Sequence, residues 1–134
     1  MVDDYVSHPN PTGATHDQYC ANTAGSVLDY QAHSSPIDML LYDGDQFPAE
    51  YAGSAFVTMR GSWNRSEPSG YKVVRLLFDE QGQPTGFEDF ASGWLLPDGA
   101  SQFGRVAGLA QLADGSLLVS TDSAGVIYRI SYAA

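Results

Sequence analysis

The fold is decided by residues 55–78, AFVTMRGSWNRSEPSGYKVVRLLF. The run 55–59 is short and apolar, and residues 71–78 form a second run rich in β-branched and aromatic side chains, so both are predicted strands. The connection of roughly ten residues between them is longer than a simple hairpin turn requires. It carries Arg60, Trp63, Asn64 and Arg65 close together. Because loops held between rigid strands are where proteins usually place binding groups, we expect this connection to recognise a ligand.

Composition places the chain among folded, turn-rich β proteins. Its 134 residues are long enough for one domain with a modest core, and 43% of them are hydrophobic. Aromatic residues make up 12%, and the 14 glycines and 7 prolines come without any long stripe of helical periodicity. The predicted fold class is therefore all-β.

The charge balance excludes two kinds of partner. Sixteen acidic residues against six Lys plus Arg give a formal net charge of -10. Nucleic-acid binding needs a basic patch, and an anionic membrane surface attracts basic segments, so we expect neither partner. No apolar run approaches the ~20 residues of a membrane span, and residues 1–5 lack the features of a signal peptide.

Further along the chain, strand and turn signals alternate in two units. Residues 1–24 show little periodicity and are predicted to be an irregular lead-in. The following residues predict one unit of four strands and one of three, the second containing an Asp114-Gly115 hairpin turn. The expected strands are 37–42, 55–59, 71–78 and 85–91, then 104–112, 116–120 and 126–132. Units of this size are typical of four-stranded antiparallel propeller blades, so residues 25–132 are predicted to form about two blades of a β-propeller.

Several of these motifs, in this order, resemble the C-terminal third of the pyrroloquinoline quinone-dependent sugar dehydrogenases, of the sorbosone and pyranose dehydrogenase type. The resemblance extends from about residue 25 to 132, and its most specific element is Gly61-Ser62-Trp63-Asn64-Arg65. The other matching segments are AHSSP (32–36), FPAEY (47–51), SEPSGYKVV (66–74), GRVAG (104–108), DGSLLVS (114–120) and GVIYRI (125–130).

The resemblance implies a six-bladed propeller that holds pyrroloquinoline quinone over its central channel, near calcium. It also implies a small-molecule sugar substrate, a separate electron acceptor and a periplasmic or secreted location. The chain departs from the family because the first four blades are absent, and with them the general base and most of the calcium ligands. We therefore predict no catalytic residue and no metal ligand here. The chain is expected to be part of a longer protein whose remaining blades are its partners, and Arg60 stands where related sequences have histidine.

Pyrroloquinoline quinone is a flat aromatic tricarboxylate, so its site should offer arginines for the carboxylates and flat faces for stacking. Of the five arginines, Arg60, Arg65 and Arg105 lie in predicted loops or at strand ends. The remaining basic residues, Lys72, Arg75 and Arg129, lie inside strands and are expected to cover the sheet surface.

Five residues are the candidates for cofactor binding: Arg105, Arg60, Trp63, Asn64 and His33. Arg105 resembles the family's carboxylate-binding arginine by its position before the Asp114-Gly115 turn, although a surface ion pair is the alternative. Trp63 either stacks on a ligand or packs in the protein, and Asn64 either binds ligand or caps its turn. His33 either lines the cofactor pocket or is a hydrogen-bonded structural residue. Arg65 is expected to brace the loop against Glu67.

Two functions fit the sequence. The first is part of a soluble quinoprotein oxidoreductase that oxidises a sugar or sugar-derived aldehyde, with little activity in the fragment alone. The second is a non-catalytic propeller module that binds a carbohydrate or a protein. We also expect exposed sheet edges that favour association.

Overall fold

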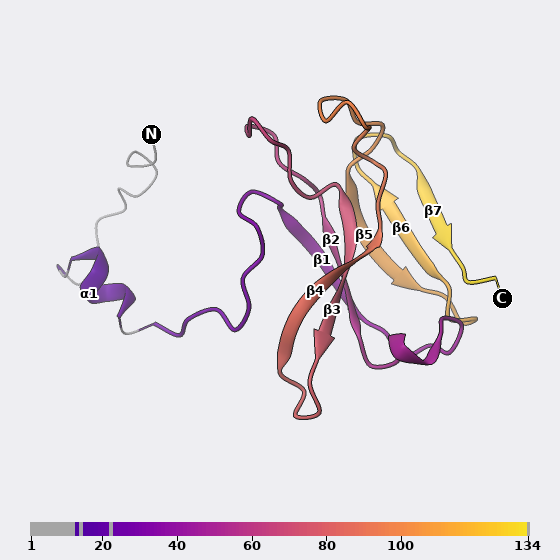
Figure 1. Ribbon diagram of the computed structural model, residues 1–134, viewed down its shortest axis with the longest axis horizontal. Coiled ribbons are helices and arrows are strands. Elements are labelled where there is room, and N and C mark those ends of the chain that lie inside the picture. The colour runs from indigo at the N-terminus through magenta and orange to yellow at the C-terminus, as the bar shows by residue number, and fades with distance from the viewer. Residues whose placement is uncertain (1–12, 14, 22, 134) are drawn as a thin grey trace.

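The computed structural model describes residues 13, 15–21 and 23–133. Two antiparallel sheets lie side by side, as in neighbouring propeller blades (Figure 1). The first has the order β1-β2-β3-β4, formed by Pro36–Leu41, Ala55–Met59, Lys72–Phe78 and Pro84–Ala91. The second has the order β5-β6-β7, formed by Val106–Gln111, Leu117–Thr121 and Ile127–Ile130. The prediction of an all-β chain with a four-stranded and a three-stranded unit is confirmed.

Two short helices accompany the sheets: α1 at His16–Cys20 and the 3-10 helix η2 at Ala49–Tyr51. The sequence did not predict α1, which lies within the expected irregular lead-in. Its cause is local: Thr15 and Gln18 form a capping box, in which each side chain accepts a hydrogen bond from the other residue's backbone N–H. No helix among the described residues is long and apolar enough to cross a membrane.

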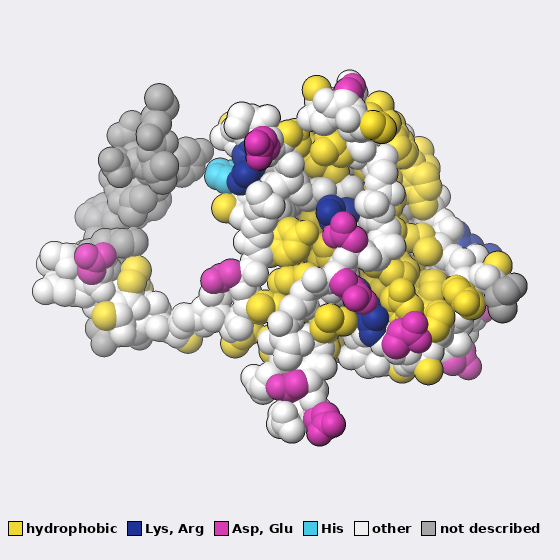
Figure 2. All heavy atoms as spheres, in the orientation of Figure 1, with side chains coloured by type: hydrophobic (Ala, Val, Ile, Leu, Met, Phe, Trp, Pro, Cys, Tyr) yellow, Lys and Arg dark blue, Asp and Glu magenta, His cyan; other side chains and the backbone are white. Residues whose placement is uncertain are grey.

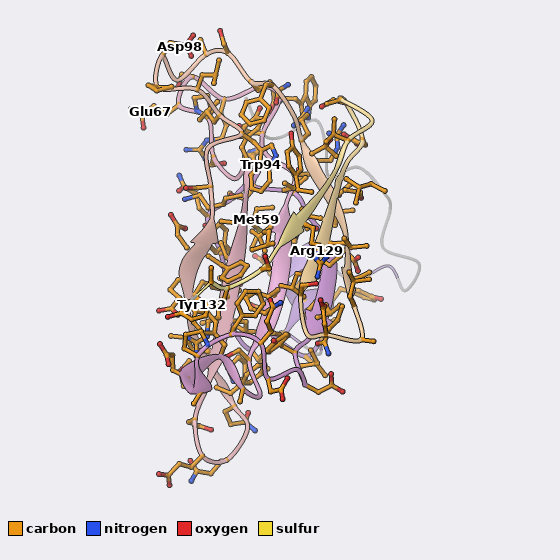
Figure 3. All side chains as sticks on the ribbon, turned by 90° about the vertical axis from the view of Figure 1, so that its right-hand side faces the viewer. Met59, Glu67, Trp94, Asp98, Arg129 and Tyr132 are labelled. Carbon is orange, nitrogen blue, oxygen red and sulfur yellow. The ribbon has the colours of Figure 1, made fainter. Side chains whose placement is uncertain are left out.

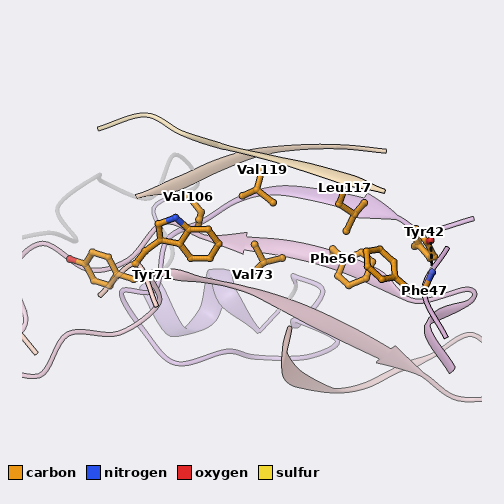
Figure 4. Close-up of a cluster of buried hydrophobic side chains, with 9 residues drawn as sticks. Tyr42, Phe47, Phe56, Tyr71, Val73, Val106, Leu117 and Val119 are labelled. Carbon is orange, nitrogen blue, oxygen red and sulfur yellow. Dashed lines mark hydrogen bonds between the residues drawn. The ribbon is translucent and has the colours of Figure 1, made fainter. Parts of the chain in front are cut away.

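The main core lies between the two sheets. β5 packs against β1 and β2, and Phe56, Val73, Val106, Leu117 and Val119 are fully buried there. Figure 4 shows this core extending from Tyr71 at one end to Tyr42 and Phe47 at the other. Burial of these side chains is the main force that holds the sheets together.

Two polar side chains set how the sheets align across this core. The Thr58 hydroxyl donates to the Ala107 carbonyl at 2.6 Å, and the Leu109 N–H donates to the Asp38 carboxylate at 2.8 Å. Both β1 and β5 carry a register shift close to these contacts, at Pro36/Asp38 and Val106/Leu109. Because a bulge frees backbone groups from the ladder, side chains of the neighbouring sheet can reach them.

The outward faces of the two sheets carry apolar side chains. On β1, Ile37, Met39 and Leu41 point to one face and are more than half exposed. On the second sheet, Ile127 is also more than half exposed. Figure 2 shows hydrophobic side chains at the surface over the second sheet. The expected association of the chain stays a prediction, which light scattering across a concentration series would check.

Candidate functional site

Four segments, three of which carry the candidate residues, meet at one end of the sheets. They are 32–35 before β1 and the connections 60–71, 92–105 and 122–126, which follow β2, β4 and β6. In antiparallel sheets these strands all finish at the same edge, so their connections are neighbours. Figure 3 shows Glu67 of the connection 60–71 and Asp98 of the connection 92–105 at this end, with Tyr132 at the other.

The connection 60–71 is closed at its base by two glycines. Gly61 has φ 100° and Gly70 has φ 85°, a region that residues with a Cβ rarely adopt. A Cβ on Gly70 would lie 2.8 Å from both the Gly61 Cα and the Ser34 carbonyl oxygen. Between them, the Ser62 N–H donates to the Ser69 carbonyl at 2.9 Å, and the Ser69 N–H donates to the Ser62 hydroxyl oxygen at 3.1 Å. Glycine is therefore required at both positions for the loop to close.

Arg105, which immediately precedes β5, holds this loop from the side of the second sheet. Its Nη2 donates to the carbonyl oxygens of Gly61 and Ser62, the latter at 2.9 Å, and its Nε donates to the Arg60 carbonyl at 3.3 Å. The guanidinium also lies 5.3 Å from the centre of the Tyr71 ring. The structure thus places most of the Arg105 donors on backbone carbonyls, and neither a surface ion pair nor a free guanidinium describes this residue.

The Arg60 guanidinium contacts the neighbouring connection 122–126. Its Nε pairs with the Asp122 carboxylate at 2.6 Å, with side-chain exposures of 32% and 41%. Among the residues that the structure describes, neither Nη atom of Arg60 has a hydrogen-bond partner, so these donors remain available to a ligand. The sequence did not single out Asp122, which meets Arg60 only because the connection 122–126 folds onto the same end.

His33 lies beside the loop 60–71 in an unusual backbone conformation. It is exposed and has φ 68°. The neighbouring Ala32 carbonyl accepts from Arg65 Nη1 at 3.2 Å, and the Ser34 carbonyl accepts from the Gly61 N–H at 2.8 Å. The segment is therefore pinned on both sides of His33, while the imidazole stays accessible.

Trp63 and Asn64 occupy the outer part of the loop. Both are exposed, Trp63 at 79%, so the packing interpretation of this tryptophan was wrong. Arg65 braces the loop as expected, although its Nε donates to the Glu67 backbone carbonyl, at 2.9 Å. The result is a fixed loop that presents a large aromatic side chain to solvent.

Arg75 corrects another expectation. It does not cover the sheet surface but is 9% exposed. Its guanidinium bonds the Ser54 hydroxyl at 2.7 Å and Glu88 at 2.6 Å and lies 4.4 Å from the centre of the Tyr51 ring. Lys72 and Arg129, in contrast, pair with Asp89 and Asp114 at the surface. A strand position alone does not reveal which arginine has buried partners.

The described residues form no cluster of acidic side chains of the kind that commonly binds calcium. Within residues 13, 15–21 and 23–133, no three His, Cys, Asp or Glu side chains gather where they could hold a metal ion. Asp98, in the connection 92–105, illustrates why. Its carboxylate accepts the Ser101 and Ala100 backbone N–H groups, which hold its pKa below the ordinary value of 3.8. It is engaged within its own turn rather than shared with other acids.

Comparison with known proteins assigns this arrangement to a family, because the TrAA12-like profile matches residues 2–133. The chain belongs to the TrAA12-like family. A pyrroloquinoline quinone-dependent pyranose dehydrogenase of Coprinopsis cinerea is 32% identical, with 95% of this chain and 19% of that protein aligned. An uncharacterized protein of Borreliella burgdorferi is 37% identical over 108 residues, covering 80% of this chain and 28% of that protein.

Solved structures of two similar proteins share the fold. The iodide structure of the Trichoderma reesei family AA12 enzyme superposes with a TM-score of 0.68 at 27% identity, covering 89% of this chain and 30% of that one. The holo form of the Coprinopsis cinerea pyranose dehydrogenase PQQ domain gives 0.59 at 28% identity, covering 75% and 27%. The chain is thus a module related to pyrroloquinoline quinone-dependent oxidoreductases, and it spans less than a third of the length of these relatives. The narrower sorbosone branch stays a prediction.

Proposed function

We propose that this TrAA12-like module binds pyrroloquinoline quinone as one part of a sugar-oxidising oxidoreductase. The observation that carries the proposal is that Arg60, Trp63 and Asn64 lie on the loop 60–71 and His33 on the segment 32–35, two segments that hydrogen bonds pin together at one end of the sheets. The donor chemistry fits a flat tricarboxylate: a guanidinium with two open Nη groups, an amide and an imidazole. Arg105, whose donors hold the loop, serves as a positioning residue in this arrangement.

The chemistry of oxidation belongs to the quinone, which accepts two electrons when it is bound. The role of this chain is to bind and orient it. Arg60 would meet a carboxylate, and Asp122, which shares the Arg60 cation, fixes the guanidinium from the other side. His33 and Asn64 would donate hydrogen bonds to the quinone or accept them from it. Because no base was identified in the sequence and no calcium ligand set is formed by the described residues, we expect binding without turnover.

The same proposal extends to substrate, partners and location. The substrate would be a sugar or a sugar-derived aldehyde. Calcium, an electron acceptor and further propeller blades would complete the site. The whole protein would be periplasmic or secreted. The family relation supports the sugar substrate, since a relative is named as a pyranose dehydrogenase. The non-catalytic carbohydrate- or protein-binding module remains the competing function.

The test is calorimetric titration of the chain with pyrroloquinoline quinone, with and without calcium. The wild type should bind saturably, and Arg60→Ala should weaken the affinity about tenfold, because a charge-assisted contact is worth about 1.5–3 kcal/mol. Arg129→Ala is the matched control, since Arg129 also pairs with one aspartate but belongs to β7 and reaches the turn that joins β5 to β6. Absence of saturable binding, or equal losses in both variants, would overturn the proposal.

A further inference from the structure

Each sheet packs on the other with one face, which leaves a second, outer face on each. In the first sheet Phe56 lies in the core between the sheets, so its neighbour Val57 points to the opposite face, because side chains alternate along a strand. In the second sheet Val119 lies in the same core, so Leu118 and Ser120 point away from it. The packed pair of sheets therefore has one outer face on each side.

The outer face of the first sheet carries a protruding apolar row along β1. Ile37, Met39 and Leu41 are 55%, 58% and 67% exposed. Further across the sheet this face is already covered, since the ring of Tyr30 packs edge-on against that of Phe87, with ring centres 5.0 Å apart. A contiguous apolar row, unlike apolar side chains scattered singly, marks a contact surface. The uncovered part of this face is therefore the β1 row.

The outer face of the second sheet is recessed instead. It has a shallow, mostly apolar hollow of about 200 Å³, whose lining includes the small residues Gly108, Ala110 and Ser120 together with Leu118 and Ile127. A water molecule occupies about 30 Å³ of the liquid, so the hollow has room for an apolar side chain. A protruding row and a recessed surface are complementary in shape, whereas two protruding rows are not.

Charged side chains beside these faces already have partners. Lys72 is paired with Asp89 and Arg129 with Asp114. The Asp38 carboxylate, at the border of the β1 row, accepts a hydrogen bond from a backbone N–H of β5. Contact between the two faces would thus remove apolar surface from water without leaving these charges buried and unpaired, which is the condition for favourable association.

We propose that the outer face of the second sheet in one copy of this chain packs on the β1 row of the next copy, so that several copies form a closed ring. The contact would continue the arrangement inside the chain, where β5 packs against β1 and β2 and the two sheets lie side by side (Figure 1). Because the two faces differ, the contact is heterologous, and such contacts close when the rotation between copies allows it. Propellers close with about four to eight blades, so chains of two sheets would form rings of about two to four copies.

The ring names a partner for the proposed function, since other copies would supply the further blades, but it does not depend on quinone binding. Cyclic symmetry orients every copy in the same way, so the candidate sites on the connections 60–71 would gather on one side of the ring. The mass of the assembly is measured without any cofactor. Failure of the ring and failure of the quinone site are therefore seen in separate experiments.

Light scattering coupled to size-exclusion chromatography tests the ring on the chain alone. The monomer mass is 14.4 kDa, and the wild type should approach one limiting mass of about two to four times that value as the concentration rises. Met39→Glu and Ile127→Glu each place a charge on one of the two faces, so each variant alone should be a monomer. Leu41→Glu, at 67% exposure in the same row, repeats the first substitution if Met39→Glu does not fold.

A mixture of Met39→Glu and Ile127→Glu identifies which faces meet. The first variant keeps an intact second-sheet face and the second an intact β1 row, so one productive contact remains. The mixture should form a heterodimer of twice the 14.4 kDa monomer mass, although neither variant associates by itself. Phe103→Glu is the matched control, because Phe103 is 51% exposed but lies in the connection 92–105, and its mass should equal that of the wild type. Circular dichroism confirms that each variant is folded.

Three results would overturn the inference. A wild type that remains a monomer would leave the faces to the blades of a longer chain, and a mass that grows without limit would indicate open polymers. Loss of association in only one of the two variants, or a mixture that stays monomeric, would mean that identical faces meet. Association of both variants at the wild-type mass would assign the contact to other surfaces, such as the sheet edges.

Discussion

The two ends of the sheets are held by different chemistry. At the end with the candidate site, arginine side chains bind backbone carbonyls: Arg105 those of residues 60–62, and Arg65 those of Ala32 and Glu67. At the opposite end, aromatic rings pack around Phe56, which contacts Phe47, Tyr51 and Phe90. Arginine bracing fixes a loop while leaving its outer surface open, whereas aromatic packing closes the surface. The accessible end is therefore the one suited to ligands.

The largest expected effect is on the aromatic end. Phe56→Ala removes a fully buried ring and should lower the free energy of unfolding by about 3–5 kcal/mol, because a cavity is left among rings that cannot collapse fully. Urea denaturation measures the loss. A loss below about 1 kcal/mol would contradict the view that this end is held by aromatic packing.

The next effect is on the arginine-braced end. Arg105→Lys keeps the positive charge, but lysine has no planar guanidinium that could donate to three carbonyls. The substitution should therefore lower the free energy of unfolding by about 2–3 kcal/mol. Amide hydrogen exchange should also accelerate in residues 60–71, which a merely global loss of stability would not confine there. Arg129→Lys, at an exposed ion pair, is the control and should change stability by under about 0.5 kcal/mol. Equal effects would show that Arg105 has no special role.

A smaller effect isolates one polar contact within the aromatic end. The Tyr42 hydroxyl donates to the Gly115 carbonyl at 2.9 Å and accepts from the N–H groups of Gln46 and Phe47. Tyr42→Phe keeps the ring and should lower the free energy of unfolding by about 1–2 kcal/mol, since these buried groups lose a partner. Urea denaturation beside Phe56→Ala compares polar with apolar contributions. An unchanged midpoint would mean that water replaces the hydroxyl.

The smallest effect is a pH dependence that both ends share. Hydrogen bonds from Ser101 and Ala100 lower the pKa of Asp98 below 3.8, and at the opposite end the side chain and backbone of Ser116 lower the pKa of Asp114 below 3.8. A carboxyl with a lowered native pKa stabilises the fold above its unfolded pKa, and this contribution is lost as the pH falls through the native value. Asp98→Asn should thus destabilise the protein slightly at neutral pH and not at pH values below both pKa values. A carboxyl titration by NMR that gives Asp98 an ordinary or raised pKa would contradict this.

Much of the architecture could be predicted because it depends on local pattern. Strand β2 was expected at its observed bounds, Ala55–Met59, since a run of β-branched and apolar residues between turn signals has few alternatives. The Asp114-Gly115 turn followed from the same logic, and Gly115 adopts φ 81° there. Helix α1 was missed because a capping box in a polar segment gives a weaker signal than apolar periodicity.

The sequence by itself determined the all-β class, the order of the strands and the loop that gathers Arg60, Trp63 and Asn64, because these depend on neighbours along the chain. Tertiary structure alone decided what each side chain meets. It gave Arg105 three carbonyls, buried Arg75 beside Tyr51, paired Arg60 with Asp122 and exposed Trp63 beside Ala100. A guanidinium or an indole has the same local preference in each setting, so its role is fixed by partners that lie far away in the sequence.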